Sequence, residues 1–564
     1  MSSESLHDPS DEVASELDLA TLSAPTKAAG DSMTVAVWTV VSRATGVAKF
    51  AAIGAVLGPT FFGNTFQFTN SLPNLLYYGF LGGSLFSSLL IPSLVNHIDS
   101  GDRRSTERVA GGFLGVTMVA LACVTPLAIV FGPLLLRLAS LGGAAQVVGA
   151  DQQRVGMYLI VMFIPQVFLY SVVGSATAVM NAHRRFALAA AAPALENIGM
   201  IVVLCIAAVV YGTGATLGSV STGELLLLGL GTTGAVALHA SVQWWGARRT
   251  GATLIPRWGW HDPEVRAVVY RGLPSLAQAS LLALQMLALL SVANRIPGGV
   301  VAFQMALNFY YLAIALGATP VALSLAPRLA RMRERGEEKL FTDTLLRGFA
   351  LAFFVTIPAA VAYLTLARPL ARAVSFGQMS SAVGVSLVAI SLRALALAVI
   401  GQTAFDLCTY ASYARKDTRS PLRSMTLQAA VCLLLLTATL VVHGTDVVLV
   451  LGLGFSAAIC VAAVHLGGRL FKRLEPGAER IWPSVVKVVV GAAAMVVPAW
   501  LTARLLERMT AGQAGSVAAM LLAALVGVAI FLAVQALLKT PELGWITGGL
   551  SDVRPRSRRE PRHG

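Results

Sequence analysis

The sequence predicts an all-α polytopic membrane protein with about fourteen transmembrane helices. Hydrophobic residues make up 56% of the 564 residues and charged residues only 12%, whereas soluble domains carry roughly 25% charged residues. Apolar runs long enough to cross a bilayer of about 30 Å recur along the chain. These runs must be helical, because a helix satisfies its own backbone hydrogen bonds inside lipid.

The first 33 residues contain acidic residues, Ser and Pro but no apolar run, so we expect a disordered tail rather than a signal peptide. The spans that follow have bounds good to a few residues. They are expected at 34–58, 66–96, 110–136, 155–181, 187–211, 224–246, 266–294, 299–327, 345–367, 382–411, 421–443, 446–468, 484–503 and 514–538.

The net charge of +14 comes from basic residues that gather in the even-numbered loops between these spans and in the C-terminal tail. The positive-inside rule then places both termini in the cytoplasm. Basic loops of this kind indicate anionic lipid headgroups, and not nucleic acid, as their partners.

Two segments recur at nearly one spacing. The run that begins at Tyr77 resembles the run that begins at Tyr310, and the end of the fourth span near Asn181 resembles the end of the tenth near Tyr413. Spans 1–6 and 7–12 are therefore predicted to be parallel repeats of one six-helix unit. The expected organisation is an N-tail (1–33), an N-lobe (34–246), a cytoplasmic linker (247–265), a C-lobe (266–468), two further helices (469–540) and a basic cytoplasmic tail (541–564).

The second span, within Asn64–Leu94, is unusually polar in its first half and contains Pro73. Proline removes a backbone donor and bends a helix, and polar groups at membrane depth need a cavity or the bundle interior. We therefore expect a bent helix that lines a cleft between the lobes, together with spans 1, 7 and 8. Two lobes around a cleft indicate transport by alternating access.

Cations inside the spans are candidate anion-binding groups, because an unpaired charge there is costly. Arg43 and Lys49 lie on the first span, six residues apart, so both cannot point squarely into one cavity. Lys49 lies near the outer end and can instead reach the interface. The structural alternative for Arg43 is pairing within the bundle.

The remaining candidates are polar groups that suit sugar hydroxyls and amides, or that hold helices together by hydrogen bonds. Asp406, near the cytoplasmic end of span 10, is a counter-charge, an ion-coupling carboxylate or a structural group, and Arg393 lies midway along the same span. The amides and tyrosine in this set are Asn64, Gln67, Asn70, Asn74, Tyr77, Gln285 and Asn308.

The sequence contains no nucleotide-binding loop, no metal cluster and no carboxylate pair at catalytic spacing. Neither an enzyme nor a cofactor is predicted, and a membrane potential or an ion gradient remains open as the energy source. The five cysteines lie inside apolar segments, where they are expected to pack as small hydrophobic residues.

Several motifs resemble the MurJ/MviN family, the lipid II flippases of the MATE-like multidrug/oligosaccharidyl-lipid/polysaccharide (MOP) exporter superfamily. They lie in spans 1, 2, 4–5 and 10, and the span count also agrees. The matching residues are Ser42-Arg43 with Gly46-Val47-Ala48-Lys49, Leu72-Pro73-Asn74-Leu75-Leu76, Asn181-Ala182-His183-Arg184-Arg185-Phe186 with Pro193 and Asn197-Ile198, and Tyr413 to Pro421.

The chain departs from the family pattern where substrate charge matters. Tyr77 and Tyr78 replace a basic pair, Asn64 stands for an aspartate, and Asn308 falls where the family usually has an arginine. A cavity with fewer cations binds a pyrophosphate less strongly.

The resemblance implies a monomeric flippase of the bacterial cytoplasmic membrane that moves a lipid-linked peptidoglycan precursor, lipid II, to the outer leaflet. Arg43 and Lys49 would hold its pyrophosphate, and a groove by spans 13 and 14 its lipid tail. One alternative is an exporter of another lipid-linked glycan or amphiphilic metabolite. Another is a flippase-like scaffold that no longer transports and recruits cell-wall synthesis proteins through its tails.

Overall fold

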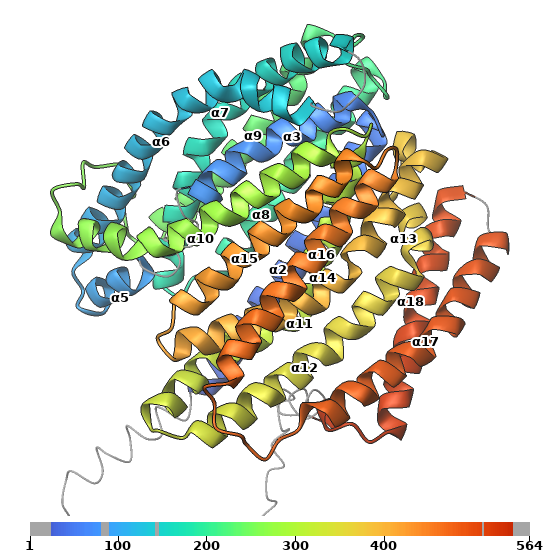
Figure 1. Ribbon diagram of the computed structural model, residues 1–564. Coiled ribbons are helices and arrows are strands. Elements are labelled where there is room, and N and C mark those ends of the chain that lie inside the picture. The colour runs from blue at the N-terminus through green and yellow to red at the C-terminus, as the bar shows by residue number, and fades with distance from the viewer. Residues whose placement is uncertain (1–23, 81–89, 141–145, 510–511, 545–564) are drawn as a thin grey trace, which may run out of the picture.

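The computed structural model describes residues 24–80, 90–140, 146–509 and 512–544, and this part of the chain is helical (Figure 1). The N-terminal half contains α2 (Ala24–Leu57), α3 (Phe61–Leu75), the π-helical turn η1 (Leu76–Phe80), α5 (Ile91–Asp99), α6 (Arg103–Ser140), α7 (Gln146–Ala182), α8 (Phe186–Tyr211) and α9 (Thr222–Arg248). The C-terminal half contains α10 (Pro263–Ala293), α11 (Gly299–Glu334), α12 (Glu338–Thr365), α13 (Ala367–Val374), η3 (Gly377–Ser380), α14 (Ala382–Ala414), α15 (Arg419–Leu436), η4 (Thr437–Leu440), α16 (Asp446–Phe471), α17 (Ile481–Met509) and α18 (Gly512–Leu537).

Within the described residues, 13 helices are long and apolar enough to cross a membrane. They coincide with all of the predicted spans except the second. That span comprises α3, η1 and α5, and residues 81–89 between them lie outside the described part of the chain. The prediction of an all-α polytopic membrane fold is confirmed.

Pro73 interrupts the second span as its sequence predicts. Thr60 caps the start of α3 by accepting a hydrogen bond from the backbone N–H of Gly63 at 3.0 Å. Regular α geometry ends at Leu75, two residues after Pro73, and a π turn follows. Because proline supplies no backbone donor, the ladder shifts its register at this point.

The first helix begins earlier than predicted. α2 starts at Ala24, so Ala24–Met33 are helical, although residues 1–33 were expected to be a disordered tail. The physical reason is the local sequence, in which Pro25 lies in the first turn and the following alanines and Lys27 favour a helix that continues into the span.

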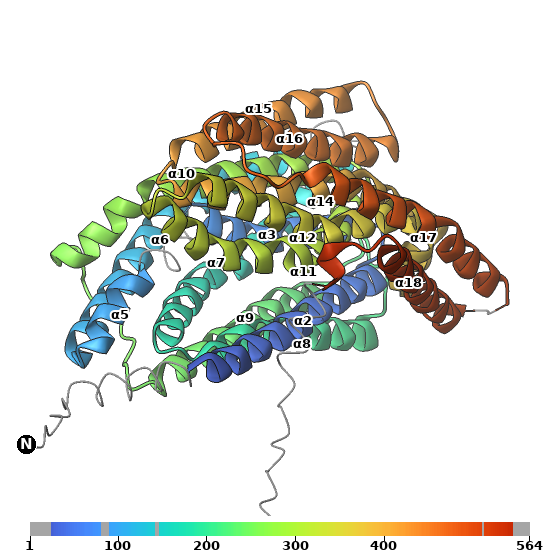
Figure 2. The ribbon, with the colours of Figure 1, turned by 90° about the horizontal axis from the view of Figure 1, so that it is seen from below.

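The two halves pack in the same way, which confirms the predicted repeat. In the N-lobe, spans 1 and 5 (α2, α8), 2 and 4 (α3, α7), and 4 and 6 (α7, α9) are in contact. In the C-lobe, the equivalent pairs α10 and α15, α11 and α14, and α14 and α16 are also in contact. α17 and α18 pack on each other at one edge, beside α12 and α13 (Figures 1 and 2).

The ends of spans 4 and 10 provide the sharpest sign of the repeat. Arg184 and Lys416 both adopt positive φ angles, 57° and 60°. In each copy the next residue donates its backbone N–H to a carbonyl five residues earlier, Arg185 to Met180 and Asp417 to Ser412. This is a Schellman helix end, so the similarity in sequence corresponds to one shared backbone conformation.

Candidate substrate cavity

A polar cavity of about 560 Å³ lies between the lobes. Spans 1, 2, 7 and 8 line it as predicted, and α7, α8, α14, α15 and α16 add further residues. The predicted residues that the structure brings together on its wall are Lys49, Gln67, Asn70, Asn74, Gln285, Asn308 and Asp406.

One end of the cavity is closed by hydrogen bonds between the lobes. The Asn64 side chain donates to the carbonyl of Ile296 at 2.7 Å and accepts the backbone N–H of Val300 at 3.0 Å. Gln67 donates to Gln304, whose Nε2 donates to the Ser71 hydroxyl at 2.8 Å. We call these residues the amide seal.

The loops next to the amide seal approach very closely. Gly298 has a φ of +75°, and a Cβ there would lie 2.4 Å from the Cα of Pro59. Only glycine tolerates both the backbone angle and the contact. Nearby, Gln378 of the C-lobe donates to the Thr213 hydroxyl of the N-lobe at 3.0 Å.

A second contact between the lobes involves the π turn and α10. The Ser280 hydroxyl donates to the carbonyl of Gly79 at 3.0 Å. A Cβ on Gly79 would lie 2.1 Å from that of Ala283, so small side chains permit the approach. The cavity therefore lies between two places where the lobes touch.

Two of the predicted amide and tyrosine residues, Asn64 and Tyr77, do not line the cavity. Asn64 is fully buried in the amide seal, because it lies one turn before Gln67, at the level where the lobes meet. Tyr77 packs against Tyr170, with ring centroids 6.1 Å apart, in the N-lobe core. The π turn that begins at Leu76 changes the angular position of Tyr77 from the one that an α-helix would give.

The N-lobe side of the cavity carries a charged group of residues, which we call the N-lobe cluster: Lys49, Tyr170, Glu196 and His239. One oxygen of Glu196 accepts from the Tyr170 hydroxyl at 3.1 Å, and the other bonds to Nδ1 of His239 at 2.8 Å. The charges of Lys49 and Glu196 also attract each other. The carboxylate therefore joins the phenol and the imidazole by hydrogen bonds and attracts the cation electrostatically.

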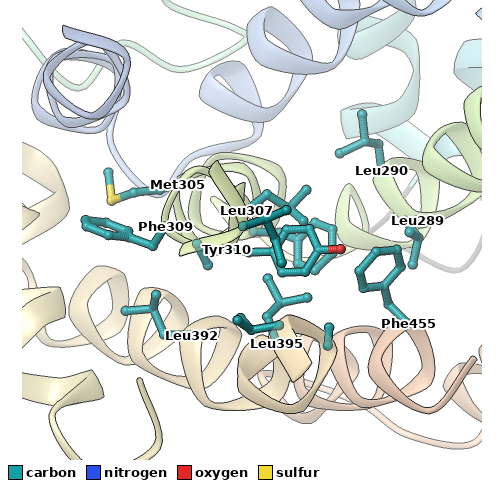
Figure 3. Close-up of a cluster of buried hydrophobic side chains, with 14 of the residues drawn as sticks. Leu289, Leu290, Met305, Leu307, Phe309, Tyr310, Leu392, Leu395 and Phe455 are labelled. Atoms are coloured by element: carbon teal, nitrogen blue, oxygen red, sulfur yellow. The ribbon is translucent and has the colours of Figure 1, made fainter. Parts of the chain in front are cut away.

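The C-lobe side carries a different group, which we call the C-lobe cluster: Tyr310, Gln402 and Asp406. The Tyr310 hydroxyl donates to Gln402 at 2.9 Å, and Gln402 donates to Asp406 at 2.7 Å. Figure 3 shows Tyr310 beside Phe455, with ring centroids 5.7 Å apart. Among the described residues, no cation lies within ion-pair distance of Asp406.

The two predicted arginines lie away from this wall. Arg43 is exposed on α2, within electrostatic range of Tyr311, which lines the cavity. Arg393 lines a separate cavity formed by α13, α14 and α18. Six residues separate Arg43 from Lys49, and the structure gives only Lys49 a place on the central wall.

Sequence reasoning missed Glu196, His239 and Gln402. Each is a polar residue within an apolar helix, and the same signal identified Asp406. What the sequence alone does not give is the pairing of Glu196 with His239, because these residues lie on different helices.

This wall can bind an amphiphile with many hydroxyl and amide groups. Eight amide side chains line it, Asn70, Asn74 and Asn308 among them, and provide donors and acceptors, while Lys49 provides a cation. Glu196 partly neutralises that cation, so an anionic group must compete with the carboxylate for it.

Known proteins with similar sequences agree with this architecture. The family model "Lipid II flippase MurJ" matches residues 53–536. A probable lipid II flippase MurJ of Bdellovibrio bacteriovorus is 26% identical over 472 residues, covering 81% of this chain and 85% of the relative. A relative of the same name from Rhizobium tropici is 25% identical over 402 residues, covering 71% and 73%.

Solved structures show the same fold. A lipid II flippase MurJ in an inward closed conformation superposes with a TM-score of 0.69 at 15% identity, covering 90% of this chain and 98% of that one. An inward-facing multidrug resistance MATE family transporter of the MOP superfamily gives 0.56 at 17% identity, covering 78% and 96%. With the family match across both lobes, these findings show that the chain belongs to the lipid II flippase MurJ family.

Proposed function

We propose that this protein is a flippase that moves lipid II across the cytoplasmic membrane of a bacterium by alternating access. The observation that carries the proposal is the polar cavity between two lobes of one repeat, closed at one end by the amide seal. Membership of the lipid II flippase MurJ family supports the same substrate.

In this mechanism the headgroup occupies the cavity and the lobes then rock. The pyrophosphate contacts Lys49, and Arg43 attracts it from its exposed position on α2. Amide side chains bind the sugars and the peptide by exchanging hydrogen bonds with water for hydrogen bonds with the substrate. Breaking the amide seal then opens the cavity on the other side.

The proposal includes the remaining expectations from the sequence. Both termini lie in the cytoplasm, the protein acts as a monomer without a cofactor, and a membrane potential or an ion gradient drives the cycle. Basic loops contact anionic lipids, and cell-wall synthesis proteins are partners. The protein carries out transport and no covalent chemistry.

Depletion with complementation tests the proposal. A bacterial host is depleted of its own lipid II flippase while this chain is expressed, and lipid II exposed on the outer leaflet is measured. We expect growth and exposure to recover. A Lys49→Met variant at equal membrane abundance is the control and should recover neither. If lipid II exposure stays as low with the wild-type chain as in the depleted host alone, the assignment is refuted.

One observation favours a second substrate class. Among the described residues, Lys49 is the only cation on the wall of the central cavity, and the charge of Glu196 offsets it. A less anionic lipid-linked glycan or another amphiphile fits such a wall. Binding to the purified protein distinguishes the two, because a ligand without pyrophosphate that displaces lipid II at lower concentration would favour the alternative. The scaffold alternative predicts that Lys49 is dispensable and that the tails are not.

A further inference from the structure

A second cavity, of about 880 Å³, lies in the C-lobe away from the central one. It is formed where α13, the first half of α14 and the start of α18 meet, at the right of Figure 1. Three arginines from two helices line it: Arg368 and Arg372 on α13, and Arg393 on α14. Nothing in the transport cycle above uses these residues.

The three arginines are not neutralised equally. Arg372 forms an ion pair with Glu507 of α17. Arg368 and Arg393 are exposed, and neither has a carboxylate within ion-pair distance in the described part of the chain. The cavity therefore has two uncompensated positive charges.

The position of Arg393 indicates that its charge needs a partner. It lies within α14, a span with a mean hydropathy of 2.3. A cation on such a helix is costly unless water or an anion solvates it. A bound anion that bridges Arg368 and Arg393 would remove that cost.

A buried hydroxyl in the same cavity also lacks a partner. Ser375 is fully buried and lines the cavity, and its Oγ has no hydrogen-bond partner among the described residues. Buried polar atoms without partners are uncommon in native structures. An anion oxygen beside the two arginines would accept a hydrogen bond from this hydroxyl.

The wall is ordered and partly apolar. Gln513 of α18 donates to the carbonyls of Arg372 and Ala373 at 2.8 and 3.1 Å, which fixes α18 against α13. Val385, Ala389 and Ile390 form an apolar side. A ligand that fits both sides has an anionic head and a hydrocarbon part.

We propose that this cavity binds the phosphate group of an anionic membrane lipid. Arg368 and Arg393 contact the phosphate, Ser375 donates to one of its oxygens, and the apolar side contacts the first part of the acyl chains. Lipid at this place bridges α13, α14 and α18, and so strengthens the attachment of the last two helices to the C-lobe. This inference does not depend on which substrate the central cavity carries.

Native mass spectrometry of the full-length protein tests the site, with phosphatidylglycerol and phosphatidylcholine added to delipidated protein. We expect phosphatidylglycerol to bind preferentially. Arg368→Gln and Arg393→Gln should each weaken its binding roughly fivefold, while Arg393→Lys keeps most of it. Arg508→Gln is the matched control, because Arg508 is exposed on α17 and does not line this cavity.

Other measurements keep the test decisive. The unfolding midpoint without lipid checks that each variant is folded, and Ser375→Ala replaces any arginine variant that is not. Equal binding of phosphatidylglycerol by all variants, or equal binding of the two lipids, would overturn the proposal. Stabilisation by inorganic phosphate without lipid binding would also overturn it. Lipid II binding should remain unchanged in Arg393→Gln, which separates this site from the proposed transport function.

Discussion

The two sides of the central cavity satisfy their carboxylates in opposite ways. In the N-lobe cluster, Glu196 is held by Tyr170 and His239 and attracts the charge of Lys49. In the C-lobe cluster, the described residues hold Asp406 only through the neutral chain of Gln402 and Tyr310. The two lobes are copies of one repeat, yet the N-lobe side of the cavity attracts an anion and the C-lobe side does not.

This difference indicates how the cavity orients an amphiphilic headgroup. An anionic group is favoured at Lys49 and disfavoured at Asp406, since like charges repel more strongly where water is sparse. Under the proposed function, sugars and peptide amides would then face the C-lobe side, where Gln285 accepts from Gln428 at 3.3 Å. The repeat supplies the scaffold, and a few substitutions make its two faces unequal.

The largest effect is expected at Lys49. Lys49→Met removes the cation that the described residues place on the wall and its attraction to Glu196, so flipping should fall by about 100-fold or more. Lipid II exposure at matched protein abundance measures it. The double variant Lys49→Met with Glu196→Gln should recover stability but not transport. Near-normal transport in the single variant would show that the charge on the N-lobe side is not needed for anion binding.

Removing the competing carboxylate should have the opposite sign. Glu196→Gln frees Lys49 for the ligand, so a pyrophosphate lipid should bind roughly tenfold more tightly to purified protein. Titration of lipid II against the wild-type and variant proteins checks this. Weaker binding would mean that Glu196 positions Lys49 and does not compete with the ligand.

The loops after spans 4 and 10 provide a comparison of the lobes outside the membrane. Asp417 accepts the backbone N–H groups of Arg419 and Ser420 and pairs with Arg473 at 2.9 Å, whereas Arg185 follows span 4. Asp417→Asn should cost about 1 kcal/mol of stability, because the amide keeps the acceptor for the two backbone N–H groups but cannot accept from Arg473 and the Ser420 hydroxyl. The unfolding midpoint in detergent measures it, with Arg185→Gln as the matched control.

The same carboxylate predicts a pH dependence. Partial burial raises the pKa of Asp417, but hydrogen bonds from Ser420 and the charge of Arg473 outweigh it, so the pKa is lowered overall. Its stabilisation is therefore complete above the ordinary pKa of about 3.9 and is lost as the pH falls through the lower folded value. The difference between wild type and Asp417→Asn should disappear in that acidic range.

The smallest effect is expected at Asp406. Asp406→Asn keeps the shape of the C-lobe cluster and removes only a distant like charge, so lipid II binding should tighten by no more than about threefold. The same titration measures it. A loss as large as that of Lys49→Met would show that the C-lobe side also takes part in anion binding or ion coupling.

The positions of the helices along the chain and their repeat could be predicted from the sequence, because apolar runs and recurring segments indicate them directly. Pro73 marked the break in span 2, and the likeness of Asn181 and Tyr413 marked two equal helix ends. Polar residues in apolar helices also identified seven residues of the cavity wall, Gln285 and Asp406 among them.

The remainder of the site depends on features that the sequence does not report. The π turn gives Tyr77 a different direction, and the height at which the lobes meet turns Asn64 into part of the amide seal. The pairing of Glu196 with His239 requires two helices to be placed side by side. Polarity predicts that a residue is inside the bundle, but packing decides which neighbour it meets.

The central claim is that the lobes must separate at the amide seal for transport to occur. Thr213 and Gln378 bridge the lobes next to the seal, so cysteines at both positions in a variant without native cysteines should form a cross-link. We expect lipid II exposure to be lost when this pair is oxidised and restored by a reductant, while either single cysteine leaves it unchanged. Exposure at the wild-type level with the cross-link fully formed would contradict the account.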